Sequence, residues 1–320
     1  MRDDRRSFLK TSLGGLAGIA AMPLLGTLSG CAAGPSGPGA ARGGRVAALP
    51  VAQLAGSVSV ITGAPGNVVA LEAADGFVLV DSGSPDLAAS VRATLGGTRV
   101  RTLFNTHYHA DQTGGNALFA QAGAEIRAHT ITKQWLAADY YVPAEDRWVK
   151  APPRQAVPTV TFRNRGELLA GSERIEYGYL LEAHTRGDAY VFFRDSNVLA
   201  AGDVASPLRD PVHDWFAGGW LGGRVDALDD LLELANAQTR IVPAYGDVMS
   251  RAQLQAERDL MSKLYDRTTA LTAKGHSAQD MLHAGVLDGV GREFQDPFRF
   301  LYDVAKGLQA HYTNFAGNVV

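Results

Sequence analysis

The sequence predicts an α/β protein built as a four-layer αββα sandwich, with further helices at its C-terminal end. Short β-rich runs alternate with helix-like stretches in two successive halves of the chain. Strands in both halves end in histidine or aspartate, which are residue types that bind metals. Two facing sheets that carry helices on their outer faces would bury the apolar side of every such element.

Each element of the first half has its own signal. Runs rich in β-branched and apolar residues predict the strands, and Pro85 and Gly96 are typical of the start and the stop of a helix. The predicted strands are 57–62, 67–72, 77–81, 99–105 and 124–129, and the predicted helices are 85–97 and 115–121.

The second half repeats this order and then becomes helical. The helix predicted over 224–237 places Val225, Leu228, Leu231 and Leu232 on one stripe, at the spacing of an amphipathic helix. The remaining predicted strands are 173–181, 189–194, 197–201 and 239–242, and the C-terminal helices are 253–274, 278–283 and 297–313. Two irregular stretches, 139–159 and 207–223, are either walls of a substrate pocket or solvated connectors.

The chain divides into four predicted parts. Residues 1–31 are a signal segment, 32–50 a flexible tether rich in Gly, Ala and Pro, 51–270 the main domain, and 271–320 a helical extension packed on it.

The predicted signal segment has two marks of export. Arg5 and Arg6 precede a mild apolar run that ends at Leu28, and this order resembles a twin-arginine export signal. Cys31, the only cysteine of the chain, closes a stretch that resembles a bacterial lipoprotein processing site. The alternative is a soluble helix with an incidental buried cysteine. We expect an exported, periplasmic protein that touches the membrane only through a lipid anchor.

Composition narrows the class of partner. Of the 320 residues 46% are hydrophobic and 20% charged, which suits one large globular domain or two smaller ones. The net charge of −3 gives no basic field for nucleic acid. We therefore expect no nucleic-acid partner; a small-molecule substrate is expected from the site motifs below, and composition leaves protein partners open.

The most informative segment is Asn105-Thr106-His107-Tyr108-His109-Ala110-Asp111, directly after a predicted strand. Imidazole and carboxylate ligands close together on one loop suit zinc, and imidazole also suits iron, copper and nickel. The alternative is a chance grouping among the eight histidines of the chain.

This segment resembles the signature His-x-His-x-Asp-His of the metallo-β-lactamase superfamily. Four further segments fit that family in the right order, and together they cover about residues 51 to 270. They are the strand ending at Asp81, the loop with His184, the strand ending at Asp203 and the strand ending before Tyr245. The resemblance implies a metallo-β-lactamase-like αββα fold, and it makes Asp81 an orienting residue for a ligand histidine.

The resemblance also implies a metal centre with two departures. His107, His109 and His184 would hold one zinc ion firmly, leaving a fourth position for water. A second metal would use Asp111 and Asp203, but Gln112 and Tyr245 stand where the family has histidines. Amide and phenol oxygens are poorer zinc ligands than imidazole, so the second metal is expected to be weak or absent.

The expected activity is zinc-dependent hydrolysis of a carbonyl-containing small molecule, a lactam, lactone, ester or thioester. Zinc lowers the pKa of bound water from about 15.7 to roughly 7, and Asp111 would act as general base and acid. Tyr245 would donate to the developing oxyanion, or it is simply a packed aromatic residue. The alternatives are an iron-dependent oxygenase or redox enzyme on the same fold, and a non-catalytic metal-binding lipoprotein.

Lipidation is testable at one residue. In a bacterial host, a fatty-acid analogue should label the parent protein and should fail to label the Cys31→Ser variant, because only the thiol can carry the lipid. Equal labelling of both proteins would refute lipidation at Cys31.

Overall fold

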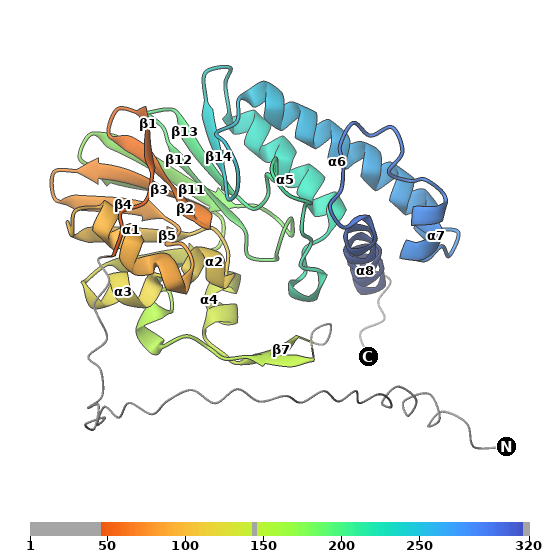
Figure 1. Ribbon diagram of the computed structural model, residues 1–320, viewed down its shortest axis with the longest axis horizontal. Coiled ribbons are helices and arrows are strands. Elements are labelled where there is room, and N and C mark those ends of the chain that lie inside the picture. The colour runs from red at the N-terminus through yellow and green to blue at the C-terminus, as the bar shows by residue number, and fades with distance from the viewer. Residues whose placement is uncertain (1–45, 143–145, 316–320) are drawn as a thin grey trace, which may run out of the picture. The chain divides into compact units, whose positions relative to one another are not determined.

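The structure is a computed structural model that describes residues 46–142 and 146–315 (Figure 1). The predicted signal segment and most of the predicted tether lie outside the described residues. Leu49, near the end of the predicted tether, packs against the core of the first sheet, and its backbone N–H donates to Thr94 Oγ1 at 2.7 Å.

The first half of the domain forms a seven-stranded mixed sheet. Its order is β1-β2-β3-β4-β5-β6-β9, with antiparallel pairs from β1 to β4 and parallel pairs from β4 to β9. Parallel strands place their carboxyl ends at one edge, and the predicted metal ligands follow β5 there. The strands are β1 (Val51–Ala55), β2 (Val58–Ala64), β3 (Gly66–Ala73), β4 (Gly76–Val80), β5 (Val100–Asn105), β6 (Glu125–His129) and β9 (Val160–Phe162).

Short helices cover the outer face of this sheet. Val91 of α1 and Phe119 of α3 pack against Leu79, Leu103 and Ile126 of the strands, so the helices close one apolar layer. The elements are the 3₁₀ turn η1 (Pro85–Leu87), α1 (Ala88–Thr94), α2 (Ala110–Thr113), α3 (Asn116–Gln121) and α4 (Thr130–Leu136).

The second half forms a five-stranded sheet in the order β10-β11-β12-β13-β14, antiparallel except for the parallel pair β13–β14. Val69, Val80 and Phe104 of the first sheet contact Val191 and Ala200 of the second in a shared core. The strands are β10 (Arg165–Ala170), β11 (Glu173–Tyr179), β12 (Ala189–Phe193), β13 (Val198–Gly202) and β14 (Arg240–Pro243).

Helices from the C-terminal part cover the second sheet and complete the four layers (Figure 1). Leu228 and Leu231 of α5 join Leu264 of α6 and Leu301 of α8 in one core, so the C-terminal helices pack on the domain. The helices are α5 (Leu221–Leu234), α6 (Arg251–Thr272), α7 (Ala278–His283) and α8 (Pro297–Phe315). The predicted αββα sandwich with C-terminal helices is confirmed. None of the described helices is long and apolar enough to cross a membrane.

The structure differs from the predicted elements in short segments. The stretch 139–159 contains a hairpin of two three-residue strands, β7 (Tyr140–Val142) and β8 (Arg147–Val149), and a 3₁₀ turn η3 (Arg154–Ala156), which are too short for a periodic signal. Strands β1, β9 and β10 and helix α4 were also not predicted.

Helix α5 begins three residues before its predicted start, inside a glycine-rich run. Gly222 and Gly223 are buried there, and a Cβ on Gly223 would lie 2.2 Å from the Glu182 carbonyl oxygen. Close packing therefore outweighs the low helix propensity of glycine.

Candidate metal centre

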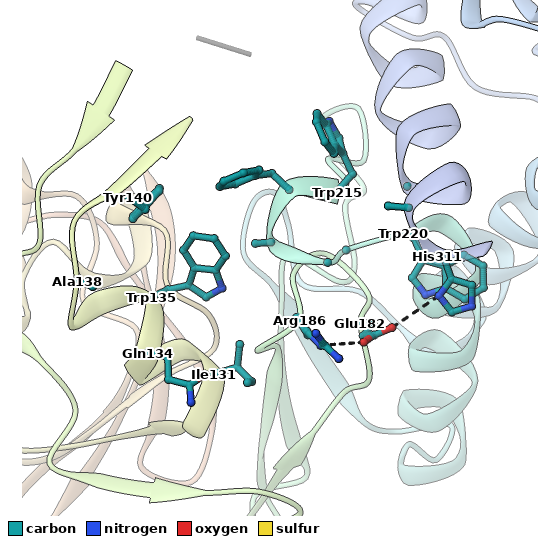
Figure 2. Close-up of a pocket in the computed structure, with 16 residues that line it drawn as sticks. Ile131, Gln134, Trp135, Ala138, Tyr140, Glu182, Arg186, Trp215, Trp220 and His311 are labelled. Carbon is teal, nitrogen blue, oxygen red and sulfur yellow. Dashed lines mark ion pairs between the residues drawn. The ribbon is translucent and has the colours of Figure 1, made fainter. Parts of the chain in front are cut away.

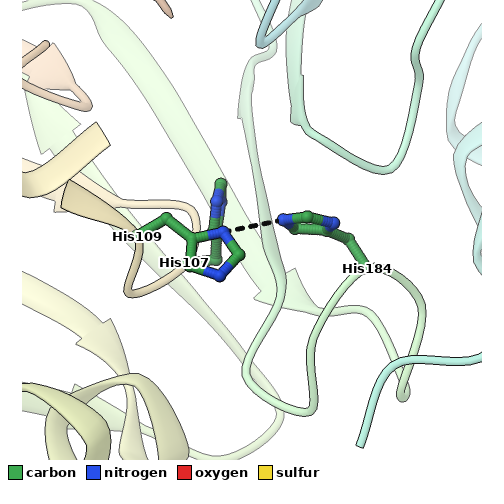
Figure 3. Close-up of side chains that lie close together, drawn as sticks. All are labelled: His107, His109 and His184. Atoms are coloured by element: carbon green, nitrogen blue, oxygen red, sulfur yellow. Dashed lines mark hydrogen bonds between the residues drawn. The ribbon is translucent and has the colours of Figure 1, made fainter. Parts of the chain in front are cut away.

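Three histidines from the two halves of the domain converge at the edge of the sheets. His107 and His109 follow the end of β5, and His184 lies on the loop between β11 and β12. One ring nitrogen of each lies within 4.8 Å of the others (Figure 3). Among the described residues this is the group that could hold a metal ion.

His107 is oriented by a buried aspartate acting through a threonine. The Thr106 backbone N–H and hydroxyl donate to the two carboxylate oxygens of Asp81 at 2.8 and 2.7 Å. The Thr106 hydroxyl oxygen lies 3.2 Å from His107 Nδ1, so it accepts the ring proton there. Nε2 of His107 is buried and has no hydrogen-bond partner within the described part of the chain, which leaves its lone pair for a metal.

The backbone around Asp81 is adapted to this task. Asp81 has a φ of 63°, a left-handed conformation that costs a non-glycine residue about 1–3 kcal/mol and is often found at functional sites. Burial raises the pKa of its carboxyl to about 8. Gly202, with a φ of 57°, approaches so closely that a Cβ there would lie 2.9 Å from Thr106 Cβ.

His109 is oriented by Asp214. Its Nε2 lies 3.0 Å from Asp214 Oδ2, an oxygen that also accepts the Tyr108 hydroxyl, and its Nδ1 lies 3.0 Å from His184 Nε2. Burial favours the protonated carboxyl, but the hydrogen bond and charge of His109 and the hydrogen bonds from Tyr108 and Ala217 together outweigh burial and bring the pKa of Asp214 to about 2. Burial lowers the pKa of His109, but the carboxylates of Asp214, Asp111 and Asp203 together outweigh burial and raise this pKa. A proton therefore competes with a metal for Nδ1.

His184 is held by the loop that carries it. Its Nδ1 lies 2.8 Å from the Val212 carbonyl oxygen and therefore carries the proton, which directs the lone pair of Nε2 toward the other two histidines. The loop is closed by Asp188, which accepts the backbone N–H groups of His184 and Thr185 at 2.7 and 2.8 Å.

A buried arginine fixes the carbonyl that orients His184. The Arg224 guanidinium, on a side chain that is 0% exposed, donates to the carbonyl oxygens of Asp203, Val204 and Val212 at 2.9, 2.7 and 2.5 Å. The path of the chain from Asp203 to Val212 is therefore tied to helix α5.

The three histidines fit a metal ion. Each has one ring nitrogen oriented by a hydrogen-bond partner and the other turned toward a common point. Burial lowers the pKa of His107 to about 4 and that of His184 well below its ordinary value, so both rings are neutral, as metal ligands must be. Three histidines that leave one position open match catalytic zinc sites.

The two carboxylates predicted for a second metal are not part of this group. Asp203 Oδ2 lies 3.5 Å from His184 Nε2, but the carboxylate forms an ion pair with Arg209 and accepts Ser206 Oγ at 3.0 Å. A ligand role for Asp203 stays a prediction.

Asp111 has partners that the sequence did not indicate. Its Oδ2 accepts the Tyr245 hydroxyl, and it also accepts Gln112 Nε2 at 3.3 Å. The two residues at the family's histidine positions thus bind Asp111. Donation from Tyr245 to an oxyanion, and a metal-ligand role for Asp111, stay predictions.

A cavity of about 280 Å³ opens beside the centre, with His109, Tyr108 and Asp214 in its wall. A larger cavity of about 860 Å³ contains no member of the histidine group (Figure 2). Tyr140, Trp215 and Phe216 line both cavities, so the larger cavity adjoins the one that His109 lines. Both irregular stretches predicted as pocket walls or connectors therefore contribute to a wall.

Sequence reasoning missed Asp214, Arg209 and Arg224. Asp214 and Arg209 lie in an irregular loop without a motif, and Arg224 reads as an ordinary polar position of an amphipathic helix. Only their contacts in the folded chain reveal their roles.

Comparisons with known proteins agree with the fold and the site. The sequence profile of the Metallo-beta-lactamase superfamily matches residues 61–257, more than half of the chain. One relative is the 2,4-dinitroanisole O-demethylase subunit alpha of Nocardioides sp. (strain JS1661), to which the chain is 28% identical over 262 residues. The match covers 78% of this chain and 69% of the relative. Another relative is the metallo-beta-lactamase type 2 of Bacillus cereus, to which the chain is 24% identical over 203 residues. This match covers 62% of the chain and 73% of the relative.

Among solved structures, the inverting sec-alkylsulfatase Pisa1 from Pseudomonas sp. is similar with a TM-score of 0.60 at 17% identity. The match covers 84% of this chain and only 50% of the sulfatase, so it bears on the fold alone. An αββα fold of this family with converging histidines at the strand ends defines a hydrolase-like enzyme with a candidate metal site. The chain belongs to the metallo-β-lactamase superfamily.

The Asp214→Asn variant tests how His109 is oriented. The amide can donate to Nε2 and so move the ring proton to Nδ1, where it would block the metal. Zinc affinity, measured by competition with a chelating dye, should fall about 10- to 100-fold. Asp259→Asn, an exposed change on α6, is the control and should leave affinity unchanged. Unchanged affinity in Asp214→Asn would contradict this role.

Proposed function

We propose that this protein is a zinc-dependent hydrolase of a carbonyl-containing small molecule that carries an apolar or aromatic group. One observation carries the proposal: three imidazoles, each oriented by its own partner, converge at one point, and one of them, His109, lines a cavity with aromatic walls. Preorganised ligands beside a cavity suit catalysis better than a structural metal site.

His107, His109 and His184 would hold the metal. When bound, zinc supplies a Lewis acid and makes a water molecule acidic enough to react at neutral pH.

Asp111 is the residue proposed to move the proton. Burial favours its protonated form, but His107 and the Tyr245 hydroxyl outweigh burial and lower the pKa of Asp111, so the carboxylate is ionised and can act as a base. It would accept a proton from the attacking water and return it to the leaving oxygen, nitrogen or sulfur.

The cavity walls indicate what the substrate carries besides its carbonyl group. Trp135 stacks on Tyr108 with ring centroids 5.0 Å apart, and it contacts Tyr140 and Phe216 at 5.0 and 5.7 Å. These rings form an apolar surface beside His109, so a planar or apolar group of the substrate can pack there and exclude water. Lactams, lactones, esters and thioesters with such a group are the proposed substrates.

A second candidate is the cleavage of an electron-poor aryl ether. It is favoured by the relative named as a 2,4-dinitroanisole O-demethylase subunit, together with the aromatic walls. The same residues would direct water to the ring carbon that bears the ether oxygen, and an alcohol would leave.

The Asp111→Asn variant separates metal binding from proton transfer. It should keep the zinc of the histidines, because Asp111 is outside that group, and lose about 10²–10⁴-fold in kcat. Hydrolysis should be followed on aryl esters, thioesters, lactones and β-lactams, with 2,4-dinitroanisole for the second candidate. The control is Asp86→Asn, an exposed carboxylate in the turn before α1.

Unchanged kcat in Asp111→Asn would contradict the assigned role. Failure of the zinc-loaded parent on all four carbonyl classes would contradict the carbonyl hydrolase. Turnover of the ether in its place would support the second candidate.

A further inference from the structure

The place where this family's second cation would lie is occupied by a side chain. Asp203 is the carboxylate expected there, and its side chain is only 1% exposed. It forms an ion pair with Arg209 Nη2 through Oδ2, the same oxygen that lies nearest His184 Nε2. A buried carboxylate requires a positive partner, and Arg209 supplies one from within the chain.

Arg209 also contacts the second departure from the family's ligand set. Its guanidinium carbon lies 3.6 Å from the centre of the Tyr245 ring, a cation–π arrangement, and the Tyr245 hydroxyl donates to Asp111. Arg209 thus binds Asp203 directly and is linked to Asp111 through Tyr245. These are the two carboxylates that a second metal would need.

The backbone that carries Arg209 is anchored from outside the site. The Arg209 carbonyl oxygen accepts Arg292 Nη2, and Arg292 is paired through Nη1 with Glu257 of α6 at 3.1 Å. Arg292 also donates to the Ser206 carbonyl oxygen at 2.7 Å. The backbone position of Arg209 is therefore held by contacts with residues outside the metal centre.

The remaining ligand position is taken by the amide of Gln112, whose Oε1 is buried and has no hydrogen-bond partner among the described residues. Gln112 is completely buried, and its Nε2 donates to Asp111. It packs so tightly on the β3 backbone that a Cβ on Gly66 would lie 2.5 Å from Nε2.

We propose that the Arg209 guanidinium is the resident second cation of this centre, so that the centre holds a single metal ion. Arg209 neutralises Asp203, packs on Tyr245 and repels a divalent ion from the space between the two carboxylates. It is a positioning residue, because it acts through Asp203 and Tyr245. The inference rests on the proposed function in one respect, that the three histidines bind zinc.

The proposal predicts that restoring the family's histidines is not sufficient to build a second site. The Gln112→His/Tyr245→His double variant should still bind about one zinc per chain, because Arg209 remains. Adding Arg209→Met should raise the content to about two, since Asp111, Asp203 and two new imidazoles are then available. The effect should be non-additive, because these residues share one site. Elemental analysis of the full-length proteins measures zinc per chain.

A matched control separates the site from a general loss of positive charge. Arg258 forms a similar ion pair with Asp229 on helices α5 and α6, through two hydrogen bonds of 2.7 and 2.8 Å. Arg258→Met in the double-histidine background should leave the content at about one zinc.

A second measurement does not depend on the triple variant folding. In a zinc titration, a second binding event that is weak or not measurable in the parent should become at least about tenfold tighter in the Arg209→Met single variant, because Asp203 loses its partner.

The outcomes that overturn the inference are distinct. Two zinc ions in the double variant would show that Arg209 is no barrier. One zinc in a folded triple variant, or an unchanged titration for Arg209→Met, would show the same. Two zinc ions in the parent would overturn this inference and leave the three-histidine site standing. A parent that binds no zinc would overturn the proposed function and this inference with it.

Discussion

The loop that orients two of the three histidines, His109 and His184, depends on the buried guanidinium of Arg224. Its bonds to the carbonyl oxygens of Asp203, Val204 and Val212 fix the loop that crosses the centre. Each of these carbonyls would cost about 1–3 kcal/mol if buried without a partner. The loop is therefore held in one conformation. This conformation positions the Val212 carbonyl oxygen, which accepts from His184, and the side chains of Arg209 and Asp214.

The centre divides into two electrostatic halves. On one side the three histidines present lone pairs to a single point, and their other nitrogens are engaged by Thr106, Asp214 and the Val212 carbonyl. On the other side the two carboxylates are bound by Arg209, Tyr245 and Gln112. In the proposed single-metal centre, the histidine half takes its cation from solution, whereas the carboxylate half has the Arg209 guanidinium as its cation. One fold can in this way keep the αββα frame and change the number of metals.

The sequence predicted the frame and the local half of the site because both depend on short-range patterns. His107 and His109 are two residues apart after a strand, so their proximity is local, whereas placing His184 with them required the family resemblance. Asp214 and Arg209 could not be found in this way, because their roles arise from the path that Arg224 imposes on an irregular loop. The early start of α5 was missed for a related reason, since packing at Gly223 overrides helix propensity.

The most direct test of the account is X-ray absorption spectroscopy at the zinc edge of the purified, zinc-loaded protein. The account predicts scattering from three imidazole nitrogens at about 2.0–2.1 Å and from at least one further light atom. Paired metals in two-metal sites usually lie about 3.5–4 Å apart. The account therefore also predicts no metal–metal scattering at about that distance. Fewer than three imidazoles would contradict the assignment of the ligands, and a metal–metal signal at that distance would contradict the single-metal centre.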